Sequence, residues 1–226
     1  MRIIYFGILF SLLCSCSNEV STSSHPYAAY FYNYDTAPKV YRYRDIIHGL
    51  NEQFHRVYGI EDSEGKHIVV ERYVQDGRLT EAFNFNLDSL NVMDHMVVNA
   101  LGENEKATLY KDQYLPKAKG ELATFTSKFS GVTDSTVFLM EVNRRLSVKK
   151  MREVLSDSLE CITLEENAIY TLLNPFTKQE SQQTLETVAC YAKGLGLVAW
   201  YDTKKRSHFQ LEEILSQEKW IKLISE

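Results

Sequence analysis

The sequence predicts a mainly β protein: a single antiparallel meander forming a curved sheet or half-barrel, with at most one or two short helices. Its 14 Tyr and 11 Phe favour strands over helices. From Pro38 onward, short β-type runs alternate with turn signals, and we find no convincing apolar stripe with a 3.6-residue period before the C-terminus. We therefore expect one β-rich domain over residues 27–226, which is long enough for one sizeable core.

In the first half, an aromatic run over residues 27–34 is expected to open the fold as a strand. Further strands are expected over residues 39–44, 53–60, 67–74 and 79–87. An Asp76-Gly77 pair between the last two is a strong hairpin signal. Residues 88–101 fit either a helix with Leu90 and Met93 on one face or an alternating strand that turns back toward residues 107–110; we favour the strand.

In the second half, strands are expected over residues 121–129, 135–146, 157–165, 168–173, 187–200 and 208–214. The Gly194-Leu195-Gly196 sequence could begin a phosphate loop, but a dinucleotide fingerprint needs a third glycine and a following helix. A bulge or bend inside a strand of the curved sheet is the expected explanation.

The N-terminus has the pattern of an export signal. Arg2 precedes an apolar run of about eleven residues, which is shorter than the ~20 that a membrane-spanning helix needs, and a small residue follows. The sequence Leu13-Cys14-Ser15-Cys16 resembles the lipobox of bacterial lipoproteins. The resemblance implies that residues 1–15 are a signal peptide and that Cys16 carries the lipid; a plain secretory signal is the alternative.

Residues 16–26 are polar and without an apolar period, so they are expected to be a flexible tether. In lipoproteins, Asp after the lipidated Cys retains the protein in the inner membrane, but Ser17 stands here. The resemblance therefore implies a lipid anchor in the outer membrane of a diderm cell.

Part of the C-terminal third also has a family-like order. Glu160-Cys161-Ile162 is followed by residues 191–198 (Tyr-Ala-Lys-Gly-Leu-Gly-Leu-Val) and by residues 211–214 (Leu-Glu-Glu-Ile). This order, spanning residues 157–214, is similar to that of uncharacterised exported β-sheet proteins. Their general shape resembles the curved, partly closed sheets of lipoprotein-carrier domains. The resemblance implies a fold and says little about function.

Charge argues against nucleic acid as a partner. The whole chain has a formal net charge of −5, and because residues 1–15 hold one Arg and no acid, the remainder carries −6. Binding to nucleic acid requires clustered cations, and the basic runs here are short and isolated.

No catalytic residue, metal ligand or cofactor is predicted. None of the six His has metal-ligand spacing. Asp94-His95 could orient an imidazole as in a catalytic triad, but no Gly-x-Ser-x-Gly motif accompanies the pair, so we expect a strand surface.

Two kinds of covalent site are expected. In an exported protein Cys161 and Cys190 could form a disulfide, or they could be two separate buried thiols. Four Asp-[Ser/Thr]-small-or-apolar sequences resemble the O-glycosylation sequon of one diderm phylum, although turn chemistry accounts for them as well. The residues that would carry glycans are Thr36, Ser89, Ser135 and Ser158.

These observations favour a membrane-anchored, non-enzymatic envelope lipoprotein that binds an apolar ligand or a partner protein through its curved sheet. The residues expected to line the concave side are Phe83, Phe85, Leu139, Ile162, Leu164 and Leu197, with a filled core as the alternative. The alternative function is an envelope hydrolase or glycan-active enzyme with carboxylates converging from separate strands.

Overall fold

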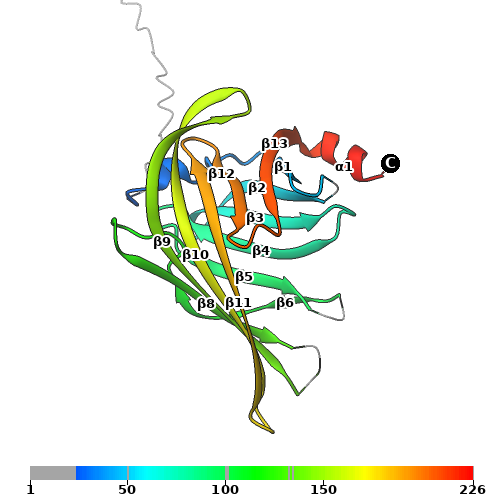
Figure 1. The fold of residues 1–226 in the computed structure, drawn as a ribbon. Coiled ribbons are helices and arrows are strands. Elements are labelled where there is room, and N and C mark those ends of the chain that lie inside the picture. The colour runs from blue at the N-terminus through cyan, green and yellow to red at the C-terminus, as the bar shows by residue number, and fades with distance from the viewer. Residues whose placement is uncertain (1–23, 50, 100–101, 132, 134, 226) are drawn as a thin grey trace, which may run out of the picture.

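The computed structural model describes residues 24–225 except 50, 100–101, 132 and 134. These residues form one antiparallel sheet of 13 strands and a single α-helix at the C-terminal end (Figure 1). This confirms the predicted β meander with one short helix. The elements are the 3-10 helix η1 (Ala28–Tyr30), the strands β1 (Lys39–Asp45), β2 (Glu52–Asp62), β3 (Gly65–Val74), β4 (Leu79–Asn86), β5 (Val92–Val98), β6 (Asn104–Lys106), β7 (Thr108–Asp112), β8 (Leu122–Ser130), β9 (Val137–Val154), β10 (Asp157–Asn174), β11 (Gln179–Ala192), β12 (Gly196–Asp202) and β13 (His208–Ser216), and the helix α1 (Gln217–Ser225).

The sheet order is β6-β5-β4-β3-β2-β1-β13-β12-β11-β10-β9-β8-β7. Strands that follow each other in sequence therefore pair, except β6 and β7, which form the two edges of the sheet. In addition, β1 pairs with β13 and joins the two ends of the chain. The sheet is so strongly curved that its edges approach each other: the Ser130 backbone N–H and hydroxyl donate to Glu105 at 2.8 and 2.9 Å. The concave face thus encloses a continuous core.

Strand alternation and turn residues explain most of this architecture. In β3 the inward positions Ile68 and Val70 are buried and face Phe85 and Phe83 of β4. The turn between β3 and β4 has Gly77 at φ 78°, as the predicted hairpin requires. Residues 88–101 contain strand β5, so the strand interpretation is confirmed.

The expectation of an opening strand over residues 27–34 is wrong. That segment is η1 followed by an irregular run, with Phe31 and Tyr32 both buried inside the concave face. Phe31 packs edge-on against Phe85, with ring centroids 5.0 Å apart, and Tyr32 against Tyr41 at 5.1 Å. Successive side chains of a strand point to opposite faces of the sheet. A segment that buries two consecutive side chains on the same face therefore cannot be a regular strand.

Two boundaries in the second half also differ from expectation. Residues 157–165 and 168–173 belong to one continuous strand, β10. The expected strand over residues 187–200 is instead the hairpin of β11 and β12, with Gly194 in its turn at φ 80° and Gly196 as the first residue of β12 at φ 86°. A Cβ on Gly196 would lie 2.5 Å from the Tyr32 ring, so the glycine allows the N-terminal segment to pack against the turn.

Helix α1 packs on the opposite side of the sheet from the main core. Its Trp220 is buried beside Phe54 of β2 and Tyr73 of β3, with ring centroids 6.3 and 4.8 Å away. No helix in the described part of the chain has the length and apolar character needed to cross a membrane.

Candidate ligand-binding site on the concave face

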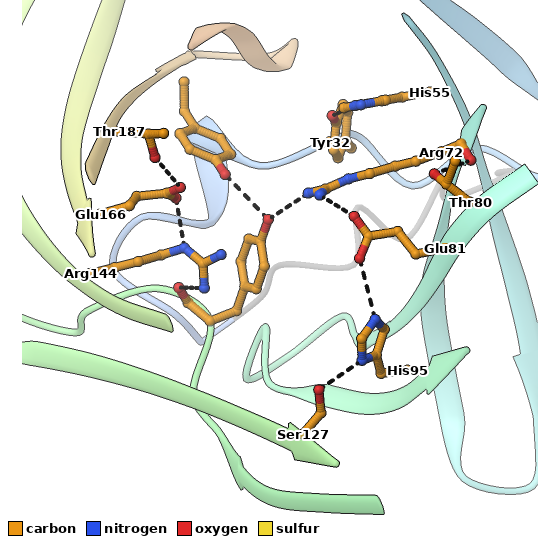
Figure 2. Close-up of polar contacts among 12 residues, drawn as sticks. Tyr32, His55, Arg72, Thr80, Glu81, His95, Ser127, Arg144, Glu166 and Thr187 are labelled. Atoms are coloured by element: carbon orange, nitrogen blue, oxygen red, sulfur yellow. Dashed lines mark hydrogen bonds and ion pairs between the residues drawn. The ribbon is translucent and has the colours of Figure 1, made fainter. Parts of the chain in front are cut away.

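Polar and charged side chains form a connected chain across the concave face (Figure 2). Arg72 of β3 donates from Nη1 to Glu81 of β4 at 2.6 Å and from Nη2 to the Tyr114 hydroxyl at 3.4 Å. The other Glu81 oxygen lies 3.3 Å from Nε2 of His95 in β5. On the far side of that ring, Nδ1 is 3.0 Å from the Ser127 hydroxyl of β8. The chain thus links strands from both ends of the sheet.

A second ion pair lies on the opposite wall. Arg144 of β9 donates from Nε to Glu166 of β10 at 2.7 Å, and the Thr187 hydroxyl of β11 donates to the other Glu166 oxygen at 3.2 Å. The Arg144 guanidinium also lies 3.9 Å from the centroid of the Tyr114 ring. Tyr114 therefore contacts both arginines and connects the two ion pairs.

Register explains why these residues meet. Arg72 is directly opposite Glu81 on one neighbouring strand and His55 on the other. Glu166 is likewise opposite both Arg144 and Thr187. Directly paired residues on one face of an antiparallel sheet have Cβ atoms about 5 Å apart, which is within reach of an ion pair.

The ion pairs favour the charged forms of Glu81, Arg72 and Arg144. Burial raises the pKa of Glu81, but Arg72 and the contact with His95 act more strongly in the other direction and bring it down to about 2. Burial likewise lowers the pKa of Arg72 and of Arg144, and the attraction of Glu81 and Glu166 respectively more than offsets this, so both pKa values lie above their ordinary value. Each arginine is thus neutralised by its own carboxylate.

Two cavities adjoin this network. One of about 100 Å³ is bordered by His55, Gln53 and Tyr191, and one of about 160 Å³ by Glu81 and Tyr170. Arg72, Glu166 and Trp200 border both cavities, so these form one hollow region. The side chains of Arg72 and Glu81 remain 28% and 24% exposed, because solvent reaches this region.

His55 is the most unusual member of the lining. Its residue is 2% exposed, its Nδ1 lies 3.5 Å from the Tyr32 hydroxyl, and its Nε2 has no hydrogen-bond partner in the described part of the protein. Burial, and then the charge of Arg72, lowers the pKa of His55 well below its ordinary value, so the ring is neutral. Arg72 Nε is also unpaired. Buried polar atoms are costly to leave unpaired, so these two atoms are candidates to bind a ligand, although other unpaired atoms, such as Thr126 Oγ1 and Trp220 Nε1, lie elsewhere in the described part of the protein.

Two larger hollows are shallower. One of about 490 Å³ shares Glu166 and Thr187 with the network and is otherwise bordered largely by outward-facing residues of β9, β10 and β11, among them Arg145, Glu165 and Glu186. Another of about 480 Å³ lies beside the turns that follow β3 and β5. Neither contains a buried unpaired nitrogen, and the concave-face region is therefore the stronger candidate site.

Ser127, His95 and Glu81 have the residue types of a catalytic triad, but not its arrangement. In that triad the serine contacts Nε2 and the acid contacts Nδ1, the reverse of the contacts here. Ser127 and His95 are 0% exposed, and the His95 ring stacks on Phe83 with centroids 4.4 Å apart. The hydroxyl has no path to a substrate, so the three residues act as a hydrogen-bonded brace between β4, β5 and β8.

His95 corrects the sequence interpretation of Asp94-His95 as a strand surface. The two residues point to opposite faces of β5: Asp94 pairs with Lys106, and His95 faces the core. We did not predict Arg72, Glu81, Arg144 or Glu166 as site residues from the sequence. The first pair could have been found, because the predicted hairpin brings Arg72 opposite Glu81.

The structure places the other sequence-predicted residues away from this site. Cys16, the residue expected to carry lipid, lies outside the described residues, as do the signal peptide and most of the tether. Thr36 and Ser158 are exposed, whereas Ser89 and Ser135 are half-buried. The Ser89 hydroxyl donates to Asn86, and the Ser135 hydroxyl is bonded to that of Thr133, as turn chemistry requires.

Cys161 and Cys190 are buried thiols whose side chains contact each other. Cys161 is opposite Ala192 and Cys190 is opposite Thr163, so the two cysteines are diagonal neighbours on adjacent strands. Burial, followed by the neighbouring Cys190, raises the pKa of the Cys161 thiol to about 12. This placement is compatible with either of the two expectations for the pair.

Of the two expectations for the concave side, an apolar groove or a filled core, the structure shows the filled core. Five of the residues expected to line that side (Phe83, Phe85, Ile162, Leu164 and Leu197) are buried, whereas Leu139 is 37% exposed. Within the described part of the chain, no group of three or more His, Cys, Asp or Glu side chains is arranged to hold a metal ion.

Comparison with known proteins supports the fold. No protein-family model matches the chain, and no curated protein matches it significantly. Two solved structures are similar, both of proteins described as putative: a lipoprotein from Parabacteroides distasonis ATCC 8503 and an exported protein with a YmcC-like fold from Bacteroides fragilis NCTC 9343. The first is 13% identical with a TM-score of 0.50, covering 86% of this chain and 100% of the other. The second is 14% identical with a TM-score of 0.49, covering 82% and 99%. The first likeness shows that the curved sheet occurs in another protein.

Proposed function

We propose that this chain is a lipid-anchored envelope protein, held in the outer membrane of a diderm cell by acylated Cys16, and that its concave face binds a small ligand without catalysis. The observation that carries the binding role is the solvent-connected hollow beside Arg72, which is also bordered by His55, a residue whose Nε2 is buried and unpaired. The lipobox-like sequence supports the anchor. A protein described as a lipoprotein shares the fold, which is consistent with this location.

The cavity chemistry favours a polar ligand over an apolar one. Arg72, Glu81 and Glu166 border the hollow region, and the expected apolar lining is occupied in packing the core. An apolar molecule placed there would remove water from charged groups without replacing their hydrogen bonds, at a cost of ~1–3 kcal/mol for each unsatisfied group.

An envelope hydrolase is the second candidate, because Glu81 and Glu166 do converge on one cavity from separate strands. Each is ion-paired to an arginine, and the low pKa of Glu81 prevents it from donating a proton near neutral pH. Hydrolysis of envelope glycans that is lost in Glu166→Gln, with binding retained, would establish the enzyme and refute a purely binding role.

The anchor is tested by Cys16→Ala, with Cys14→Ala as the matched control. Acyl chains contribute ~0.8 kcal/mol per buried CH₂, and two or more chains give stable anchoring. We expect Cys16→Ala to take up no clickable palmitate and to leave the outer-membrane fraction, whereas Cys14→Ala stays labelled and anchored. Unlabelled, soluble wild-type protein would refute the anchor.

Glycosylation of the exposed Thr36 and Ser158 is tested by intact mass. We expect the protein purified from its native envelope to exceed the mass of lipid plus polypeptide, and Thr36→Ala and Ser158→Ala each to remove one increment. A wild-type mass equal to lipid plus polypeptide would end this proposal.

Ligand binding is tested on protein purified from the native envelope and analysed by native mass spectrometry. We expect a small-molecule adduct that is released by unfolding and is absent in His55→Phe. His48→Phe is the control, because the His48 side chain is 55% exposed and bonded to Asp45. Finding no adduct, and no stabilisation of adduct-free protein by an extract of envelope small molecules, would contradict the binding role; an adduct that is itself a protein would indicate a partner instead.

A further inference from the structure

The candidate site is nearly balanced in charge, and this restricts its ligand. The cations are Arg72 and Arg144, and each has a carboxylate within 2.7 Å. His55 is neutral. An anionic or cationic ligand would have to compete with an existing ion pair for its partner, so the site favours a neutral molecule.

The hydrogen bonds around His55 determine which of its nitrogens carries the proton. The Tyr43 hydroxyl donates its only proton to the Leu197 carbonyl at 2.8 Å. The Tyr32 hydroxyl lies 3.4 Å from the Tyr43 oxygen and 3.5 Å from Nδ1 of His55, and it can donate to only one of them. Both contacts of Tyr32 are satisfied only when it donates to Tyr43 and accepts from Nδ1–H of His55. Nε2 of the neutral ring is then unprotonated, and it is an acceptor.

The two residues that hold these unpaired atoms, one a donor and the other an acceptor, border the same cavity. Arg72 offers Nε–H and His55 offers the Nε2 lone pair, from directly opposite positions on β2 and β3. A hydroxyl group satisfies both, since its oxygen accepts from Arg72 while its hydrogen is donated to His55. An ether or carbonyl oxygen would satisfy only the arginine.

The rest of the lining suits a compact ring that bears several hydroxyl groups. Gln53 and the Tyr191 hydroxyl border the smaller cavity, and Thr187 and Tyr170 the larger. Cavities of about 100 and 160 Å³ each exceed the ~30 Å³ of one water molecule several-fold. Trp200 borders both cavities, with Tyr114 and Tyr191 beside the smaller and Tyr170 beside the larger, so aromatic side chains are available to the C–H groups of a ring.

We propose that the ligand is a neutral saccharide, one hydroxyl of which bridges Arg72 Nε and His55 Nε2 in the hollow between β2–β3 and β10–β12. This inference rests on the proposed ligand-binding function and gives it a chemical class.

The experiment is an NMR titration of the protein with ¹⁵N-labelled histidine. In the free protein, the His55 ring should be neutral with Nε2 unprotonated. The probes are D-glucose, D-galactose and N-acetyl-D-glucosamine, with glucose 6-phosphate, glucosamine and laurate as anionic, cationic and apolar comparisons. We expect at least one neutral sugar to shift the His55 signals saturably, and His55→Phe to weaken its binding about tenfold, the value of one lost hydrogen bond. His48→Phe should bind as wild type.

The outcomes separate the two proposals. If only a charged compound or laurate perturbs His55, the saccharide inference is overturned while ligand binding at this site stands. If no probe perturbs His55, and the native protein carries no adduct, both the saccharide inference and the proposed ligand-binding function are refuted. A protonated Nε2 in the free protein overturns the bridging geometry without the use of any variant, so the inference stays testable even where His55→Phe does not fold.

Discussion

Arg144→Met should be among the most destabilising single substitutions in this fold. The Arg144 and Glu166 side chains are 7% and 15% exposed, and after the substitution the Glu166 carboxylate would retain only the 3.2 Å bond from Thr187. Removing one partner of a buried ion pair costs ~3–5 kcal/mol, because the other charge is left uncompensated. Since domains of ordinary stability have unfolding free energies of ~5–15 kcal/mol, the variant should lose about a fifth or more of its stability.

The assay is urea unfolding, followed by tryptophan fluorescence, of protein beginning at Ser17. The double variant Arg144→Met/Glu166→Leu should recover most of the loss, because replacing both members of a buried pair by apolar residues is often neutral or stabilising. Arg78→Met, which breaks a pair with side chains 79% and 55% exposed, is the control and should leave the midpoint unchanged. The reasoning is refuted if Arg144→Met behaves like the control, or if the double variant loses the sum of the two single effects.

Three further results are expected. Because the folded-state pKa of Glu81 is about 2 against an ordinary 4.5, its stabilisation of about 3 kcal/mol is complete above pH 4.5 and is lost as pH falls toward 2; Glu81→Gln should flatten the pH dependence of unfolding in that window, and an unchanged slope would contradict it. Gly196→Ala should destabilise the protein by ~1–3 kcal/mol more than Gly194→Ala, because both glycines have positive φ but only a Cβ at residue 196 would overlap the Tyr32 ring. Equal losses of stability would show that Tyr32 moves to accommodate the added methyl group. If envelope thiol oxidases join Cys161 to Cys190, the unfolded protein will contain no free thiol at these positions, whereas quantitative alkylation of both without reductant would show the disulfide prediction wrong.

The fold was predictable because it depends on turn residues and apolar alternation that can be recognised in short stretches of the sequence. The Asp76-Gly77 turn and the alternation of β3 and β4 lie within about twenty residues. The N-terminal segment was misassigned because aromatic residues favour strands on average, while Phe31 and Tyr32 are placed by packing against strands far along the chain. The turn at Gly194 was predicted as a bulge or bend inside one strand over residues 187–200. An apolar, alternating run continues on both sides of this glycine, and periodicity alone does not distinguish a bulge from a turn.

The site was predictable only in part. The Arg72–Glu81 pair follows from the predicted hairpin, although a bulge at residues 72/73 shifts its register. The Arg144–Glu166 pair depends on a second bulge, near Leu164, which sets the pairing of β9 with β10. A one-residue slip turns every side chain of a strand to the other face, so no reading of local alternation could assign this pair to the interior.

The position of these charges separates a binding site from an ordinary packed core. The paired inward positions Ile68–Phe85 and Val70–Phe83 of β3 and β4 are apolar, and the next inward pair is Arg72–Glu81. The concave face therefore changes from apolar to charged at this pair. A core selected for stability alone gains nothing from such pairs, because apolar replacements of similar volume stabilise as well or better. The double variant Arg144→Met/Glu166→Leu therefore also bears on function. If it is as stable as wild type but no longer binds the neutral sugar that wild type binds, the ion pair is there to shape a polar cavity. If it binds unchanged, the pair serves the fold alone, and recognition depends on His55 and Arg72.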